Sequence, residues 1–148
     1  MPAVTAPLVA RPRILLINSI GWSGVLIVAS IFGWYALPDS IRVLFTPIQI
    51  WTLIFFVFVM IFIMFTMALS WVRADADGLK VRNGLRTHRL GWDAVRGIRY
   101  RTGDPWAFAE LDDDERLMLL GIMRVDGPRA DDLVEKLRAM RADAAGAA

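Results

Sequence analysis

Two long apolar runs occupy the first half of the chain, and short alternations of apolar and charged residues fill the second half. Residues 14–37 and 48–72 carry no charged side chain, and only Asp39 and Arg42 interrupt the stretch between them. At 1.5 Å per residue the first run makes about 36 Å of helix, which is enough to cross a hydrocarbon core of about 30 Å. The pattern predicts two transmembrane helices, over residues 14–37 and 48–72.

The segment between the runs, residues 38–47, is bounded by Pro38 and Pro47, and its single acid offsets its single base. A connection this short makes the two spans antiparallel. Basic residues flank the pair on both outer sides: Arg11, Arg13, Arg73, Lys80 and Arg82. The positive-inside rule then predicts a cytoplasmic N-terminal tail over residues 1–13, a short extracytoplasmic loop over 38–47, and both chain ends in the cytoplasm.

Aromatic residues suggest where the spans meet the two interfaces. Trp51 and Trp71 are separated by 20 positions, or about 30 Å along a helix. Indole rings prefer the headgroup level, so Trp34, Tyr35 and Trp51 are expected in one belt and Trp71 in the other. Trp22 fits neither belt and is expected to pack between the helices.

A cleaved signal peptide is the alternative for the first run, because basic residues followed by apolar ones are also typical of its n- and h-regions. The run is longer than the usual h-region of about 7–15 residues, which favours an uncleaved span. Even after cleavage the second run would anchor the product, with the orientation of the polar half left open.

Small or weakly polar side chains are concentrated in the first run. Such a face lets helix backbones approach closely, so we expect it to pack against the second span. Asn18 alone, with no intramembrane Asp, Glu, Lys or His beside it, does not make an ion or proton path. The small face consists of Asn18, Ser19, Gly21, Ser23, Gly24, Ala29, Ser30 and Gly33.

The second half of the chain changes to a period of two residues. Alternating segments are separated by turn signals, among them Asn83-Gly84, Gly103-Asp104-Pro105 and the acidic turn Asp112-Asp113-Asp114. This spacing is typical of an antiparallel sheet. The predicted strands cover residues 79–82, 85–90, 97–101, 106–111 and 115–120.

The last predicted element is an amphipathic helix of about four turns. Asp126 can cap it and Pro128 lies at its second position. We expect its apolar stripe to cover the open end of a small β-sandwich or barrel, and residues 143–148 to form a disordered tail. The stripe consists of Ala130, Leu133, Val134, Leu137 and Met140.

Three stretches of the polar half carry a family resemblance. They are the DGLKVRNG hairpin at Asp77–Gly84, HRLGWDAVRGIRYR at His88–Arg101 and GDPWA at Gly103–Ala107. With the two-span anchor and the terminal helix, the chain resembles the membrane-anchored bacterial pleckstrin-homology (PH) domain proteins of actinobacteria, over about residues 71–141. The resemblance implies seven strands closed by a helix, with Trp92-Asp93-Ala94-Val95 joining one sheet to the next. It brings no catalytic motif with it.

The combined prediction is an α+β chain. A two-helix transmembrane hairpin is followed, over residues 73–142, by a small cytoplasmic PH-like β-sandwich or barrel with a C-terminal capping helix. Composition agrees, because 56% of the residues are hydrophobic and 22% are charged. The chain has no cysteine, which excludes a disulfide scaffold.

Basic side chains are the main candidates for binding. Between Leu79 and Thr102 a single acid, Asp93, opposes them. An anionic leaflet contributes about 1 kcal/mol per basic residue near its surface. Lipid headgroups are therefore the natural partner, while an acidic protein partner and an ordinary solvated strand face are the alternatives. The predicted binding residues are Lys80, Arg82, Arg86, Arg89, Arg99 and Arg101, and Lys80 with Arg82 and Arg99 with Arg101 are expected to share strand faces.

Other chemistry has weaker support in the sequence. A net charge of only +2 and five acids within residues 110–115 disfavour nucleic-acid binding. The same acids lack the glycine and distal glutamate of a calcium loop. His88 is the only histidine, so we predict no metal site, catalytic site or cofactor. Trp92, Trp106 and Phe108 are expected to fill the core rather than line a ligand cleft.

The sequence thus predicts a non-catalytic module that binds lipid or protein at the cytoplasmic face of the cell membrane. The alternative is an accessory structural subunit of a larger membrane protein complex.

Overall fold

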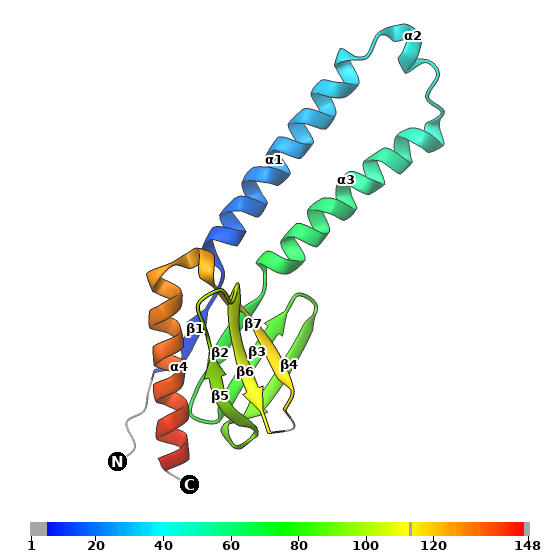
Figure 1. The fold of residues 1–148 in the computed structure, drawn as a ribbon. Coiled ribbons are helices and arrows are strands. Elements are labelled where there is room, and N and C mark those ends of the chain that lie inside the picture. Colours follow the sequence, from blue (N-terminus) through cyan, green and yellow to red (C-terminus); the bar gives the residue numbers. More distant parts are fainter. Residues whose placement is uncertain (1–5, 113, 147–148) are drawn as a thin grey trace.

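The computed structural model describes residues 6–112 and 114–146. Two long helices, α1 (Arg13–Ala36) and α3 (Pro47–Ala68), rise side by side from a two-sheet domain and are joined at their far end by the short helix α2 (Asp39–Arg42) (Figure 1). Both long helices have the length and composition needed to cross a membrane. Thr46 and Gln49 form a capping box at the start of α3, which fixes where this helix begins.

The helices contact each other through part of the predicted small face. Ser19 and Ser23 are buried, and the hydroxyl of Ser19 donates a hydrogen bond of 3.3 Å to the carbonyl oxygen of Met64 in α3. A Cβ added at Gly21, Gly24 or Gly33 would have no neighbour within 4 Å. The predicted packing role is therefore correct for the two serines and wrong for the three glycines, which make no close contact with α3.

One helix boundary and the position of one tryptophan differ from the predictions. Helix α3 ends at Ala68, and Trp71 begins the strand β2 (Trp71–Ala74), so the predicted span 48–72 is too long and Trp71 does not continue the helix. Trp22 is 64% exposed on α1 instead of lying between the helices. At the far end, Trp34 packs edge-on against Phe45 with ring centroids 5.6 Å apart.

In the described residues, seven antiparallel strands form two sheets, the number that the family resemblance implied, although one of them, β1, lies outside residues 71–141. The first sheet has the order β1-β2-β3-β4 and the second the order β5-β6-β7. The 3₁₀ turn Trp92–Ala94 connects them, as expected for that step. The remaining bounds are β1 (Leu8–Ala10), β3 (Gly78–Asn83), β4 (Arg86–Gly91), β5 (Val95–Arg99), β6 (Trp106–Leu111) and β7 (Arg116–Met123).

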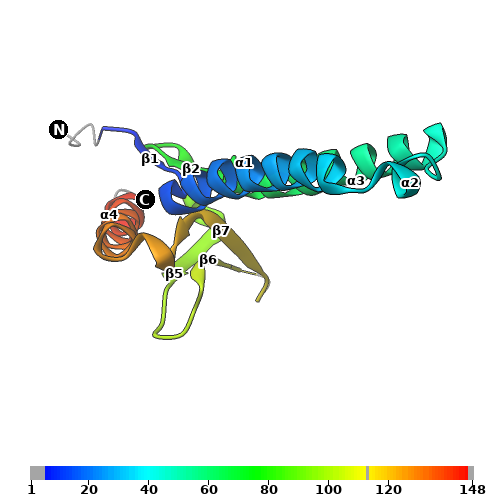
Figure 2. The ribbon, with the colours of Figure 1, turned by 90° about the horizontal axis from the view of Figure 1, so that it is seen from above.

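The first strand precedes the helical hairpin in the chain. In β1, Leu8 pairs with Ala74 and Ala10 pairs with Val72 of β2, so the hairpin is an insertion between two neighbouring strands of one sheet. Figure 2 shows β1 and β2 side by side where the helices leave the domain. The prediction of a tail over residues 1–13 is therefore wrong for residues 8–10, and residues 1–5 lie outside the described part of the chain.

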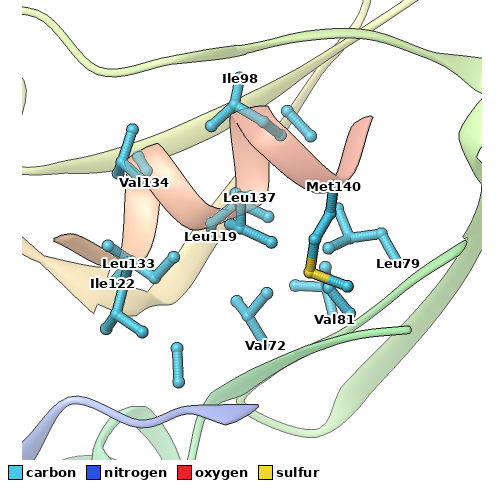
Figure 3. Packing of buried hydrophobic residues seen from close by; sticks show 14 of the residues in the cluster. Val72, Leu79, Val81, Ile98, Leu119, Ile122, Leu133, Val134, Leu137 and Met140 are labelled. Atoms are coloured by element: carbon cyan, nitrogen blue, oxygen red, sulfur yellow. The ribbon is translucent and has the colours of Figure 1, made fainter. Parts of the chain in front are cut away.

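The C-terminal helix α4 (Pro128–Gly146) closes the sandwich. Its predicted apolar stripe is buried: Leu133, Val134, Leu137 and Met140 point between the two sheets (Figure 3). Their partners there include Val72, Leu79, Val81, Ile98, Leu119 and Ile122. The helix continues to Gly146, so the predicted disordered tail is wrong for residues 143–146, while residues 147–148 are outside the described range.

Asp126 stabilises a different helix from the predicted one. Gly127, with φ of 58°, immediately precedes α4. The Asp126 carboxylate instead accepts a hydrogen bond of 3.1 Å from the backbone N–H of Ile14, in the first turn of α1. A carboxylate at a helix N-terminus satisfies a free N–H and favours the helix dipole. The PH-like domain therefore caps the first of the two long helices.

The two sheets approach each other closely at Gly121 of β7. A Cβ at this position would lie 2.7 Å from the backbone nitrogen of Val72 and 2.8 Å from the carbonyl oxygen of Ala10. Both are backbone atoms of the strands that lead into and out of the helical hairpin, so neither can move without moving the hairpin.

We predict that Gly121→Ala destabilises the domain by about 1–3 kcal/mol, because the added methyl group overpacks backbone against backbone. Gly97→Ala is the matched control, since the nearest atom to its Cβ would be a glutamate oxygen at 3.9 Å, and it should leave stability unchanged or slightly raised. Urea unfolding of the detergent-purified chain, followed by near-UV circular dichroism, measures both. Equal stability of the two variants would contradict the close approach.

Candidate functional site

The candidate site is the outward face of β2, β3 and β4. Side chains alternate across a strand, and with Val72, Leu79 and Val81 in the core the intervening residues point outward. We call the resulting set of Arg73, Lys80, Arg82 and Arg89 the basic face. In the strand register Arg73 pairs with Lys80, and Lys80 pairs with Arg89, so three cations lie in one row across three strands.

This row works against the stability of the sheet. Like charges directly opposite each other on neighbouring strands are destabilising. Within the described residues, no member of the basic face forms a salt bridge. The Nζ of Lys80 lies 5.7 Å from the centroid of the Trp71 ring, an attraction that holds the ammonium group but leaves its charge in place. The face therefore presents positive charge to an external anion.

An open hollow of about 500 Å³ lies over the basic face, lined in part by Arg73, Lys80 and Arg89. Asp75 and Asp77 also line it. The Asp75 carboxylate already accepts hydrogen bonds from the backbone N–H groups of Asp77 and Gly78, at 3.1 and 3.2 Å, so its role is to form the β2–β3 turn. The hollow is large enough for a phosphate-sized group beside three cations.

The β3–β4 turn is held against the end of α3. Gly84 has φ of 61°, and its N–H donates a hydrogen bond of 3.0 Å to the hydroxyl of buried Ser70. The Nε of Arg82 donates to the Gly84 carbonyl oxygen at 2.9 Å. A Cβ at Gly84 would lie 3.0 Å from Cγ2 of Thr66 in α3. This contact places Arg82, and exposed Arg86 on the other side of the turn, near the end of the domain from which α3 departs.

The six predicted binding residues do not form one group. Lys80, Arg82 and Arg89 share the basic face, and Arg86 lies beside the turn. Arg99 belongs to the second sheet, where it pairs with Asp104 at 3.5 Å and lies over the Phe108 ring at 5.2 Å. Strand β5 ends at Arg99, so the prediction that Arg99 and Arg101 share a strand face is wrong.

Arg73 completes the basic face and was not among the predicted binding residues. The sequence contains its signal, since Arg73 lies two positions from Trp71 and one from the buried Val72. This alternation of outward and buried positions can be recognised only once residues 71–74 are assigned to a strand rather than to the end of a helix.

The β5–β6 loop is ordered by its own ionic contacts. The N–H of Arg101 donates to the Asp104 carboxylate at 2.9 Å, and this bond, helped by Arg99, lowers the pKa of Asp104. Arg124 donates to the carbonyl oxygens of Asp104 and Arg101 and lies over the Tyr100 ring, 4.3 Å from its centroid. Burial raises the pKa of Tyr100.

The aromatic candidates divide between core and surface. Trp92 is buried in the core, as predicted, and its indole N–H donates to the Asp75 carbonyl oxygen at 2.9 Å. Trp106 and Phe108 are half-buried on the outer side of β6, so the core prediction is wrong for them. His88 is exposed on β4. In the described ranges, no group of three or more histidine, aspartate or glutamate residues could hold a metal ion.

The acidic turn lies at the far end of the second sheet, where β6 and β7 meet (Figure 1). Arg96 contacts Asp114 at 3.1 Å and Asp112 at 3.9 Å, and Asp113 is outside the described residues. Arg96 therefore offsets part of the negative charge of this predicted solvated turn.

The chain belongs to the bacterial PH domain family. The sequence model described as "Bacterial PH domain" matches residues 70–143, which covers β2 to α4 but neither β1 nor the helical hairpin. Uncharacterized proteins of Mycobacterium bovis and Mycobacterium tuberculosis are each 35% identical to it over 71 residues, or 48% of this chain and 46% of the relative. The chain thus spans about half the length of the curated relatives it matches. No solved structure matches it significantly.

A pH titration tests whether the Asp104 carboxylate is hydrogen-bonded within the β5–β6 loop. We predict that the pKa of the Asp104 carboxyl lies below its usual value of 3.8, because the Arg101 N–H, helped by Arg99, stabilises the charged form in the fold. Its stabilising contribution is therefore complete above pH 3.8 and is lost as the pH falls through the lower, folded-state pKa. Carboxyl ¹³C NMR measures the midpoint, and a value above 3.8 would contradict the loop geometry.

Proposed function

We propose that this protein is an integral membrane protein whose PH-like domain binds anionic lipid headgroups through the basic face and Arg86. The observation that carries the proposal is the in-register row of unpaired cations on a sheet that continues directly into two membrane-length helices. Its non-catalytic character is inferred from the family, whose recognisable motifs in this chain include no catalytic residue.

The position of β1 supports an uncleaved anchor. This strand precedes α1 in the chain and pairs with β2, which follows α3. Cleavage after α1 would remove an edge strand of the domain, which argues against the signal-peptide alternative. The same pairing brings both outer ends of the hairpin to one side of the membrane. The basic flanks Arg11, Arg13 and Arg73 favour the cytoplasmic side.

The distances along the strands suit electrostatic attraction to a leaflet. Arg82 and Arg86 flank the turn that contacts α3. Lys80 and Arg89 lie two and three residues further along their strands, or about 7 and 10 Å at 3.3 Å per residue. The Debye length at physiological ionic strength is about 8 Å. Lys80, Arg82 and Arg86 therefore lie within about one screening length of the turn and Arg89 slightly beyond it, and each contributes up to about 1 kcal/mol near the leaflet surface.

We predict that the double variant Arg86→Gln/Arg89→Gln retains less anionic lipid than the natural chain. Two residues at about 1 kcal/mol each correspond to a loss of up to about 30-fold in the preference for phosphatidylglycerol over phosphatidylcholine. Native mass spectrometry of the full chain released from mixed nanodiscs measures the ratio of the two retained lipids.

Arg116→Gln/Lys136→Gln is the matched control for this experiment. Both residues are exposed, away from the basic face, on β7 and α4, and the net charge changes by the same amount. The control should keep the natural lipid ratio. The same ratio in both double variants would count against a headgroup site on the basic face.

We also predict that the loop between the long helices lies outside the cytoplasm. The chain has no cysteine, so a single introduced cysteine is the only thiol of the protein that can react with a maleimide. Leu44→Cys, next to α2, should react in intact cells with a membrane-impermeant maleimide. Asp112→Cys, at the far end of the second sheet, should react only after the cells are opened. The reverse pattern would overturn the proposed orientation.

An accessory role in a larger membrane complex is the second candidate. The observation that favours it is the open space beside Gly21 and Gly24 on α1, where an added Cβ would have no neighbour within 4 Å, so that a partner helix could approach closely. The lipid experiment separates the two candidates. Loss of lipid preference in the Arg86/Arg89 variant favours the headgroup site, whereas unchanged lipid ratios with a stoichiometric protein partner in mild detergent favour the complex.

A further inference from the structure

Leu85 is an exposed apolar residue at the tip of the β3–β4 hairpin. Its side chain is 71% exposed and does not belong to the core cluster. A polar residue would serve a solvated turn at least as well, so folding does not explain a leucine here. Leu69, just after the end of α3 and also exposed, adds a second apolar side chain near this end of the domain.

The contact between Gly84 and α3 determines how close the hairpin tip lies to the hydrocarbon boundary of the membrane. Helix α3 has 22 residues, or about 33 Å of helix, against a hydrocarbon core of about 30 Å. A helix of this length reaches from one hydrocarbon boundary to the other, so Thr66 in its last turn lies close to the boundary. The Gly84 backbone lies against Thr66, and Leu85 is the next residue.

The tip cannot withdraw from this level without breaking polar contacts. The Asn83 amide nitrogen donates to the Met118 carbonyl oxygen at 2.6 Å, and its amide oxygen accepts from the Leu120 N–H at 3.4 Å. The Gly84 N–H is bonded to Ser70. The tip is thus tied both to β7 and to the segment that leaves α3.

The residues around Leu85 suit the boundary of a bilayer. Arg82 and exposed Arg86 flank the tip, and long basic side chains extend readily to headgroup phosphates while an apolar neighbour enters the acyl region. Figure 1 shows the β3–β4 turn at the end of the domain from which α1 and α3 depart. A lipid surface accounts for the apolar tip and for its basic flanks together.

We propose that Leu85 inserts at the hydrocarbon–headgroup boundary of the leaflet from which α3 emerges. The insertion is a third membrane contact besides the two helices, and it fixes the tilt of the PH-like domain so that β4 faces the headgroups. This inference rests on the proposed membrane insertion of α1 and α3, and it requires no anionic lipid.

Site-directed spin labelling of the full chain tests the proposal. Leu85→Cys carries a nitroxide label in phosphatidylcholine nanodiscs, and power saturation compares its collisions with oxygen, which concentrates in lipid, and with a water-soluble nickel chelate. Phe58→Cys in the middle of α3 is the lipid reference, and Asp112→Cys is the water reference. We expect oxygen to dominate at residues 58 and 85 and the chelate to dominate at residue 112.

A further label at Thr87 controls for the affinity of the nitroxide itself for lipid. Thr87 is exposed two residues beyond Leu85, about 7 Å further along the strand, and should be measurably shallower. Equal depths at residues 85 and 87 would overturn the insertion.

The references separate this inference from the proposal on which it rests. Chelate dominance at residue 85 with oxygen dominance at residue 58 would overturn only the insertion of Leu85. Chelate dominance at residue 58 would overturn the membrane anchor itself. In the unlabelled chain, Leu85→Asp should increase hydrogen exchange of the turn amides in nanodiscs but not in lipid-free detergent, and an equal increase in both would indicate a folding role instead.

Discussion

The pairing of β1 with β2 is the constraint on which the arrangement of this molecule depends. Only Arg11 and Pro12 separate β1 from α1, and only Leu69 and Ser70 separate α3 from β2. Two residues leave little freedom for a hinge, and Pro12 and Ser70 are both fully buried. The hydrogen-bonded register of the two strands therefore determines how the helices leave the domain. Asp126 reinforces the junction from the opposite side by capping α1.

An insertion of roughly 60 residues between adjacent strands would ordinarily oppose their pairing through loop-closure entropy, although each doubling of loop length adds only about 0.6 kcal/mol. Here the insertion is itself ordered. Ser19 and Met64 join the two helices near the domain, so the ends that enter β1 and β2 already lie close together. Helix packing and strand pairing thus support each other, and Gly121 of β7 lies against the backbone of both strands.

The features predictable from sequence were those with a strong local pattern. The charge-free runs identified the two long helices, and the apolar stripe from Ala130 to Met140 identified the closing helix. The boundary between helix and strand at residues 69–72 could not be predicted, because an uncharged segment fits the end of a helix and the start of a buried strand equally well. Strand β1 has only three residues, and its partner follows the whole hairpin, so no local signal could reveal it.

The candidate site was predictable to a similar degree and for the same reason. Alternation alone placed Lys80 and Arg82 on one face, and the Asn83-Gly84 turn aligned them with β4. The commitment of Arg99 to Asp104 depends on how the β5–β6 loop folds back, and the Asp126 cap depends on a contact between residues 112 positions apart. Neither follows from spacing along the chain.

A role in protecting the sheet edge accounts for only part of the basic face. Charged side chains on an edge strand hinder pairing with other chains, and β4 is an edge strand, which would suffice for Arg86 and Arg89. Arg73 and Lys80 lie on the two inner strands of the same sheet, where no edge needs protection. Their direct opposition reduces stability in the isolated domain, and a negatively charged surface beside them would relieve it. The inner pair, rather than the arginines at the edge, is therefore the stronger argument for an anionic partner.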